Sequence, residues 1–249
     1  RSFDAVLGIQ CDANGVVWML DNGLRSKLTP LLAGWNTRTN ALERVIYLPA
    51  PATVEASFVN DLAVDAARGV AFIADPAGPR SALIVVDLKT GAARRVLEGH
   101  PSVIPEDIDI VIDGKTPEMK GPDEKVARPR VGVDPIALDS KNEWLYFGPL
   151  NGRTMWRARA ADLIDASLPT AALAQRVERY ADRPICDGIS IDDAGNIYIS
   201  DVTNNAIGVI TPQREYKVLI KDDAVISWPD AFAFGPDGML YVVLNQLHK

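Results

Sequence analysis

The sequence has few of the residues that most often carry metal or nucleophilic chemistry, since its 249 residues include only two cysteines and two histidines. Cys11 and Cys186 cannot build a disulfide framework, so a hydrophobic core must stabilise the fold, and the length is ample for one. No thiolate or imidazole cluster offers Zn²⁺ a site. His100 and His248 fall in loop-like or terminal segments, so nothing places either of them in a Ser–His–Asp arrangement.

Two further absences narrow the class of protein. No apolar run approaches the ~20 residues that a membrane-spanning helix needs, so we expect no membrane association. The chain carries 26 Lys and Arg against 33 Asp and Glu, a net charge of −7. A nucleic-acid-binding protein would need a basic stripe instead, and we expect no nucleic-acid partner. The composition, 47% hydrophobic and 24% charged, is typical of a globular domain, and the acidic excess favours cations.

Five segments of the chain repeat one design of strand, turn and second strand. Each turn is rich in Asp, Gly and Asn, as expected between the strands of a hairpin. The first strands are 7–12, 60–65, 134–139, 187–192 and 230–235, and the second strands begin near Trp18, Phe72, Trp144, Tyr198 and Tyr241. Third and fourth strands follow in at least two repeats, where Thr39-Asn40-Ala41 parallels Thr90-Gly91-Ala92. One repeat therefore holds four antiparallel strands.

The repeat starts are separated by 53, 74, 53 and 43 residues. Four-stranded units of about 40–50 residues are β-propeller blades, so we predict an all-β propeller that occupies 1–249 as a single domain, with five sequential blades and the last one incomplete. The long interval predicts an insertion near 101–130 with a hairpin at Ile108–Ile112. Ala160–Val177 predicts a helical excursion after the third blade. A sandwich would not repeat its turns so regularly, and a parallel α/β fold would need a helix after every strand.

Polar residues recur at one position of the inner strands, which line the central channel of a propeller. Five residues before each turn stand Leu7, Asn60, Asp134, Asp187 and Asp230. The second strand of a blade runs back to the same face, and its end carries Asp21, Asp75, Asp201 or Asn245. We therefore predict that one mouth of the channel is ringed with carboxylates and amides.

Facing carboxylates repel one another and must take up protons or bind a cation. Convergent oxygens suit Ca²⁺, with Mg²⁺ as the fallback, and we predict Asn60, Asp134 and Asp187 as metal ligands. We predict Asp230, Asp21, Asp75 and Asp201 as ligand-binding residues around them. The alternative is that these side chains cap turns by accepting backbone N–H bonds. We interpret the turn residues Asp12, Asp65, Asp139 and Asp192 in this structural way.

Several segments resemble the major royal jelly protein/yellow family over almost the whole chain. They include 17–23 (VWMLDNG), 58–65 (FVNDLAVD), 142–150 (NEWLYFGPL) and 186–192 (CDGISID). The resemblance implies a six-bladed propeller of four-stranded antiparallel blades, of which this chain covers about five, with one blade and a C-terminal tail absent. It also favours an exported protein over a cytoplasmic one. The extra cysteines and glycosylation-prone loops expected of insect members are absent, which favours a bacterial-type member.

A more distant resemblance is to the senescence-marker protein/gluconolactonase propellers, whose divalent metal is bound by a Glu, two Asn and an Asp. Asn60 matches the first Asn, Asp134 stands where the second would be, and Asp187 matches the Asp. The Glu has no counterpart in this chain.

These observations leave two main hypotheses for the function. The first is a small-ligand-binding propeller, similar to yellow proteins, with its ligand at the acidic mouth of the channel. The second is a Ca²⁺-dependent lactone or ester hydrolase in which Asp187 or Asp134 is the catalytic base for water. Whether the protein is an enzyme stays open, and a protein-interaction role is a third alternative. Cys11 and Cys186 should be unpaired, because their strands lie across the channel from each other.

Overall fold

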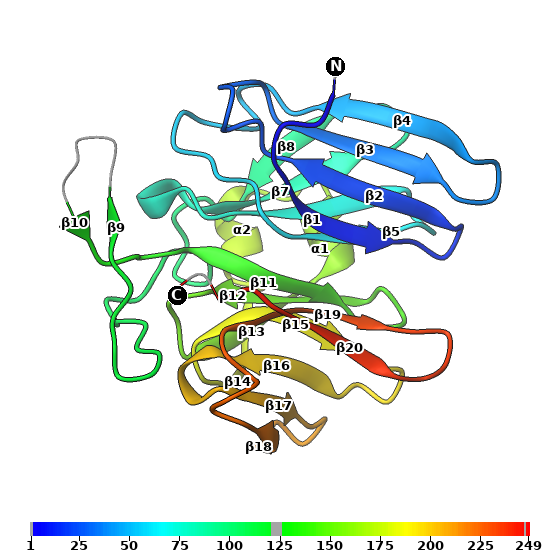
Figure 1. Ribbon diagram of the computed structural model, residues 1–249. Coiled ribbons are helices and arrows are strands. Elements are labelled where there is room, and N and C mark those ends of the chain that lie inside the picture. Colours follow the sequence, from blue (N-terminus) through cyan, green and yellow to red (C-terminus); the bar gives the residue numbers. More distant parts are fainter. Residues whose placement is uncertain (1, 121–125, 247) are drawn as a thin grey trace.

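The strands form consecutive antiparallel sheets in chain order, and the computed structural model describes residues 2–120, 126–246 and 248–249 (Figure 1). Each of the first four units below is a four-stranded sheet, which we call a blade. Blade 1 comprises β1 (Val6–Cys11), β2 (Val16–Asp21), β3 (Leu31–Asn36) and β4 (Ala41–Tyr47). Blade 2 comprises β5 (Leu62–Asp65), β6 (Val70–Asp75), β7 (Ala82–Asp87) and β8 (Ala93–Val96). Blade 3 comprises β11 (Val133–Leu138), β12 (Trp144–Pro149), β13 (Thr154–Arg159) and β14 (Glu178–Asp182). Blade 4 comprises β15 (Cys186–Ile191), β16 (Ile197–Asp201), β17 (Ala206–Ile210) and β18 (Tyr216–Lys221).

The fifth unit is a two-stranded sheet of β19 (Pro229–Phe234) and β20 (Leu240–Leu244). The prediction of an all-β propeller with four-stranded antiparallel blades is therefore confirmed. The described residues build four complete blades, not the six of the expected complete ring, and the fifth unit is incomplete with two strands, as the repeat spacing predicted.

Two local predictions were wrong. Between β8 and β11, Ile112 makes only an isolated bridge to Lys115, and the one hairpin among the described residues of this insertion is β9 (Met119–Lys120) with β10 (Val126–Ala127). The helical excursion lies inside blade 3, not after it. Two short helices, α1 (Ala160–Ile164) and α2 (Thr170–Ala174), connect β13 to β14. The remaining helical turns are the 3₁₀ segments η1 (Gly78–Arg80) and η2 (Val202–Asn204).

The innermost strands pack side by side in the order β1, β5, β11, β15 and β19. Glycine makes this close approach feasible at two of the contacts. A Cβ atom on Gly8 would lie 2.5 Å from the backbone oxygen of Asn60, and one on Gly188 would lie 2.2 Å from that of Asp230. Any larger residue would push the inner strands apart and widen the channel.

Apolar packing between the faces of neighbouring blades forms the core. Trp18 and Leu20 of blade 1 share a cluster with Ile73 and Ile84 of blade 2. The opposite face of blade 2 packs through Phe72 on blade 3 and on its helices. All six residues of β6 are buried because blade 2 is covered on both faces, which explains its continuous apolar sequence.

Two of the recurring aromatic residues bond to the aspartates that begin their turns. Trp18 Nε1 donates to Asp12 Oδ2 at 2.9 Å, and Tyr198 donates its hydroxyl to Asp192 Oδ2 at 3.2 Å. The carboxylates of Asp12, Asp65, Asp139 and Asp192 also accept backbone N–H bonds within their own turns. Their interpretation as structural residues is confirmed, since each closes the hairpin that connects two strands.

Both cysteines are unpaired, as predicted, with Cys11 exposed and Cys186 buried. Among the residues that the structure describes, no helix has the length and hydrophobicity needed to cross a membrane.

Candidate functional site

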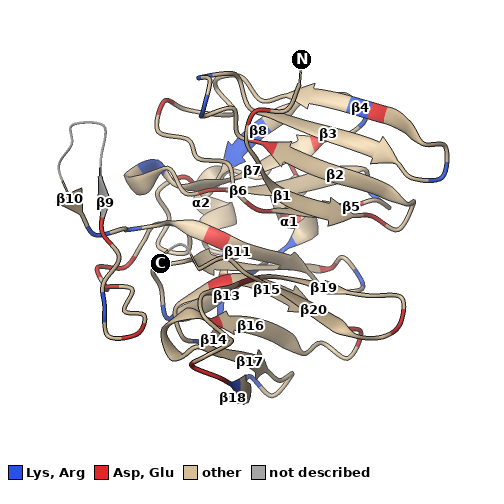
Figure 2. Ribbon diagram, viewed as in Figure 1, with Lys and Arg blue, Asp and Glu red and all other residues tan. Residues whose placement is uncertain are grey.

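The predicted inner-strand residues converge at one mouth of the channel. Asn60 donates an amide N–H to Asp134 Oδ1. Asn245 donates to Asp187 Oδ2 at 3.3 Å and to Asp230 Oδ2 at 3.2 Å. The structure thus brings together side chains from blades 2, 3 and 4 and from the β19–β20 sheet, and Figure 2 shows an acidic segment near the start of β11 at this mouth.

Asp61 lies close to the carboxyl groups of Asp187 and Asp230, although the sequence analysis did not identify it as a site residue. The backbone N–H of Asn60 donates to the oxygen of Ala74, and the N–H of Ala74 donates to the oxygen of Asp61. Two residues therefore stand opposite one, which is a β-bulge, and bulges re-aim side chains next to functional sites. Strict alternation along an extended strand would have turned Asp61 away from the channel. We call Asp61, Asp134, Asp187 and Asp230 the acidic layer.

Trp228 is the second residue that the sequence analysis missed. Its indole Nε1 donates to Asp187 Oδ2 at 2.5 Å, and the side chain is buried. Its φ of 49° is a left-handed backbone conformation that bulky residues rarely adopt. Residues held in such conformations cluster at functional sites. The sequence signal was slight: Trp228 comes immediately before the inner strand β19.

A cavity of about 400 Å³, which we call the mouth cavity, lies over the acidic layer. Its polar floor is formed by Asn60, Asp134, Asp187, Asp230 and Asn245. Its walls are mainly apolar, and they include Leu7, Phe58, Ile110, Val131, Leu150 and Trp228. The insertion between blades 2 and 3 supplies part of the wall and one further acid, Glu118. An apolar pocket with a few convergent polar groups is the usual form of a small-molecule site.

Burial and mutual repulsion keep the acidic layer from ionising fully. Burial, and then the charge of Asp230, raise the pKa of Asp187 to about 7. Burial, with the charges of Asp187 and Asp61, raises the pKa of Asp134 well above its usual value. The pKa of Asp61 is raised in the same way by burial and by Asp230 and Asp187, and burial raises the pKa of Asp230. These carboxyl groups must share protons or be neutralised by a cation.

Three predicted ligand-binding residues do not line the mouth cavity, because other groups occupy their carboxylates. Asp21 accepts the backbone N–H groups of the segment before β1 and of Gly23. Asp75 accepts bonds from Ser57, the Phe58 N–H and the Arg95 guanidinium. Asp201 accepts bonds from the Asn204 amide and the Tyr216 hydroxyl. In the β19–β20 sheet the equivalent residue is Asn245, an amide that donates to the acidic layer instead.

The arrangement does not fit a preformed metal site. Within the described ranges, no group of three or more His, Cys, Asp or Glu side chains is arranged to hold a metal ion. Asn60 turns an N–H toward Asp134, and Asp187 already accepts bonds from Trp228 and Asn245. Ca²⁺ prefers six to eight oxygen ligands, so the side chains would have to rearrange to bind it.

The histidines do not form a nucleophilic centre. Ser227 Oγ and Asp113 Oδ2 both lie near Nε2 of His248, at 3.2 and 3.4 Å. A relay through the imidazole would need the two partners on different ring nitrogens. His100 contacts Ser102, away from the mouth cavity.

The chain belongs to the major royal jelly protein family, since the family's sequence profile matches residues 5–249. The resemblance stated from the sequence motifs is therefore confirmed. A comparison with curated proteins gives no match.

Solved propellers share the fold at low sequence identity. A chain of a nidogen/laminin complex is 13% identical, with a TM-score of 0.61, and the match covers 96% of this chain and 71% of that one. A gluconolactonase from Xanthomonas campestris is 12% identical, with a TM-score of 0.59 and coverage of 97% and 69%. Virginiamycin B lyase from Staphylococcus aureus, solved with quinupristin, is 15% identical, with a TM-score of 0.59 and coverage of 96% and 63%. At these identities the likeness establishes the fold alone.

Proposed function

We propose that the protein binds a small molecule in the mouth cavity, and that this ligand carries a protonated amine on an apolar body. The observation that carries the proposal is the combination of an acidic floor with mainly apolar walls in one cavity of about 400 Å³. The apolar walls bury the body of the ligand, while its cation replaces the protons that neutralise the acidic layer.

Asp187, Asp134 and Asp230 provide the negative charge in this proposal, and three neighbours orient them. Trp228 and Asn245 hold Asp187, and Asn60 holds Asp134, so the carboxylates are positioned before the ligand arrives. Preorganisation of this kind raises affinity because less ordering remains to be done on binding. Asp21, Asp75 and Asp201 stay outside the proposed ligand shell, since intramolecular donors already occupy them.

Calorimetric titration with a panel of aromatic amines and their neutral isosteres tests the proposal. We expect the amines to bind, with affinity rising as the pH increases through about 7 and with protons released, because Asp187 has a pKa of about 7. Asp187→Asn should weaken amine binding at least about tenfold, since a charge-assisted bond is lost. Asp193→Asn, at an exposed carboxylate in the turn between β15 and β16, is the matched control. Equal affinity for amines and neutral isosteres would contradict the proposal.

A divalent-metal-dependent lactone hydrolase is the second candidate. Its support is the convergence of carboxyl groups from several blades, together with the fold shared with a gluconolactonase. The carboxylates would have to rearrange around Ca²⁺ or Mg²⁺. Titration with each metal alone, followed by a panel of lactones, separates the candidates, because the first predicts amine binding without any metal.

We also propose that the complete ring has six blades. The outermost units expose large apolar side chains, with Ile9 of β1 63% exposed and Val243 of β20 57% exposed. Additional strands packed here would bury them. Hydrogen exchange of the β20 backbone, measured on this chain and on a version extended by the proposed further strands, should show protection only in the extended version.

A further inference from the structure

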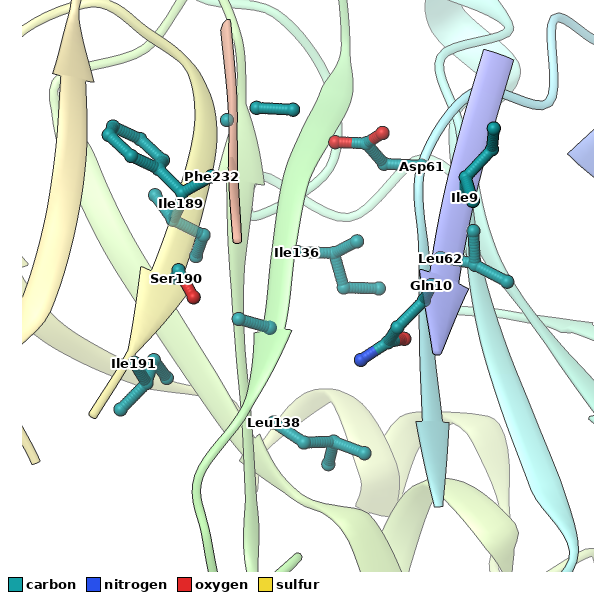
Figure 3. Close-up of a pocket in the computed structure, with 13 residues that line it drawn as sticks. Ile9, Gln10, Asp61, Leu62, Ile136, Leu138, Ile189, Ser190, Ile191 and Phe232 are labelled. Carbon is teal, nitrogen blue, oxygen red and sulfur yellow. The ribbon is translucent and has the colours of Figure 1, made fainter. Parts of the chain in front are cut away.

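A second cavity lies on the other side of the acidic layer, and we call it the lower cavity (Figure 3). Its volume is about 190 Å³, and it shares no lining residue with the mouth cavity. The inner strands line it beyond the acidic layer, with Ile9 on β1, Leu62 on β5, Ile136 on β11, Ile189 on β15 and Phe232 on β19. The lower cavity is therefore a separate chamber of the same channel.

Among the residues that the structure describes, Asp61 is the one charged residue that lines the lower cavity. The bulge at the start of β5 turns its side chain inward, and Figure 3 shows its carboxylate directed into the space between β5 and β11. The other three carboxylates of the acidic layer line the mouth cavity. One carboxyl group of the acidic layer therefore faces the lower cavity, while the other three face the mouth cavity.

The carboxylate of Asp61 also differs from its neighbours in its hydrogen bonds. Asp134 accepts a bond from Asn60, Asp187 accepts bonds from Trp228 and Asn245, and Asp230 accepts one from Asn245. No donor from the part of the chain that the structure describes bonds to the carboxylate of Asp61. The half-buried carboxylate of Asp61 is therefore free to accept bonds from a ligand that enters the chamber.

Two further polar side chains face the lower cavity. Gln10 Oε1 accepts the backbone N–H of Val64 at 2.8 Å, which leaves the amide nitrogen of Gln10 directed into the chamber. The hydroxyl of Ser190, from the opposite strand β15, lines the same chamber. The lower cavity thus combines one negatively charged hydrogen-bond acceptor, Asp61, with an amide and a hydroxyl group that can donate to a hydroxyl or carbonyl oxygen.

We propose that the lower cavity is a second binding site, for a small protonated amine that also carries a hydroxyl or carbonyl group. Asp61 binds the ammonium group, and Gln10 and Ser190 bind the oxygen. A single carboxylate compensates a single positive charge, so the site favours a monovalent cation over Ca²⁺, which needs more acidic ligands. This site is distinct from the one proposed for the mouth cavity, since the two cavities share no lining residue.

Methyl NMR at about pH 8, with isoleucine methyl groups labelled, tests the proposal. Ile136 and Ile189 report on the lower cavity, and the indole N–H of Trp228 reports on the mouth. The probes are ethanolamine, ethylammonium, which lacks the hydroxyl, and ethylene glycol, which lacks the charge. We expect saturable shifts of both methyl signals with ethanolamine, weaker binding of ethylammonium and no saturation with ethylene glycol.

Variants distinguish this site from the mouth. Asp61→Asn should weaken ethanolamine binding at the methyl reporters about tenfold or more, because a charge-assisted bond is lost. Ser190→Ala should weaken ethanolamine but leave ethylammonium unchanged. Asp187→Asn should preserve the methyl shifts, because Asp187 lines the mouth cavity and not the lower cavity. The shifts therefore test the lower cavity even if the mouth cavity binds no amine. Methyl shifts that survive in Asp61→Asn, or that saturate equally with ethylene glycol, would overturn the proposal, as would the loss of the methyl shifts in Asp187→Asn.

Discussion

Replacing Asp187 with asparagine should stabilise the protein at alkaline pH but not at acidic pH. The substitution keeps the shape of the side chain, and the amide oxygen can still accept the Trp228 N–H. It removes a charge that burial and Asp230 disfavour, as the rise of the Asp187 pKa from 3.8 to about 7 indicates. The folded state holds a proton that the unfolded state releases between these two values. Stability therefore falls as the pH rises through this window, and it levels off above about 7.

The magnitude follows from the same difference in pKa. A rise from 3.8 to about 7 corresponds to about 4 kcal/mol lost by the parent protein above pH 7, at 1.36 kcal/mol for each pH unit. The bond from Trp228 to the charged carboxylate is already contained in this difference, because it lowers the pKa of Asp187. We therefore expect Asp187→Asn to gain about 4 kcal/mol at pH 8 relative to pH 4, where Asp187 of the folded parent is also neutral.

Urea unfolding at a series of pH values, followed by circular dichroism, measures this gain. Asp193→Asn, at an exposed carboxylate, is the control. Equal stability changes for Asp187→Asn at pH 4 and pH 8 would refute the reasoning, because they would show that Asp187 is as readily ionised in the folded state as in the unfolded state.

Three other predictions concern particular side chains. Cys11 should react with a thiol reagent in the native protein, whereas Cys186 should react only after unfolding, because it is buried and burial raises its pKa to about 12. Trp228→Phe should weaken amine binding about tenfold in calorimetry, since it removes an N–H donor from the carboxylate below the mouth cavity. Asp75→Ala should destabilise the protein by about 1–3 kcal/mol in urea unfolding, because the buried guanidinium of Arg95 loses one of its two carboxylate partners and keeps only Glu98. The folded fraction of this last variant should bind amines normally.

Much of the fold was predictable because its determinants are local. A hairpin turn depends on a few adjacent residues, and the aspartates of these turns bond to backbone groups only two to four residues away. Asp12 and Trp18 illustrate the repeat, since one carboxylate closes the turn and accepts the indole N–H of the following strand. The recurrence of this unit predicted the blades, and equal positions in equivalent blades predicted that Asn60, Asp134 and Asp187 would meet.

Contacts between distant segments decided the rest. Asp75 and Asn245 occupy equivalent strand ends, yet Arg95, 20 residues from Asp75, occupies that carboxylate, while Asn245 reaches Asp187, 58 residues away. Residue type and spacing alone do not predict these partners. The insertion also became a wall of the mouth cavity only through its packing on other blades.

Asp61 shows most clearly what the linear pattern could not predict. By itself the sequence determined that a strand would begin near Asn60 and that its side chains would alternate between two faces. Only the pairing with Ala74 introduced the bulge that turns both Asn60 and Asp61 toward the channel. Pairing between strands depends on the geometry of both partners, so the tertiary structure decided which carboxylates share the acidic layer and which cavity each one faces.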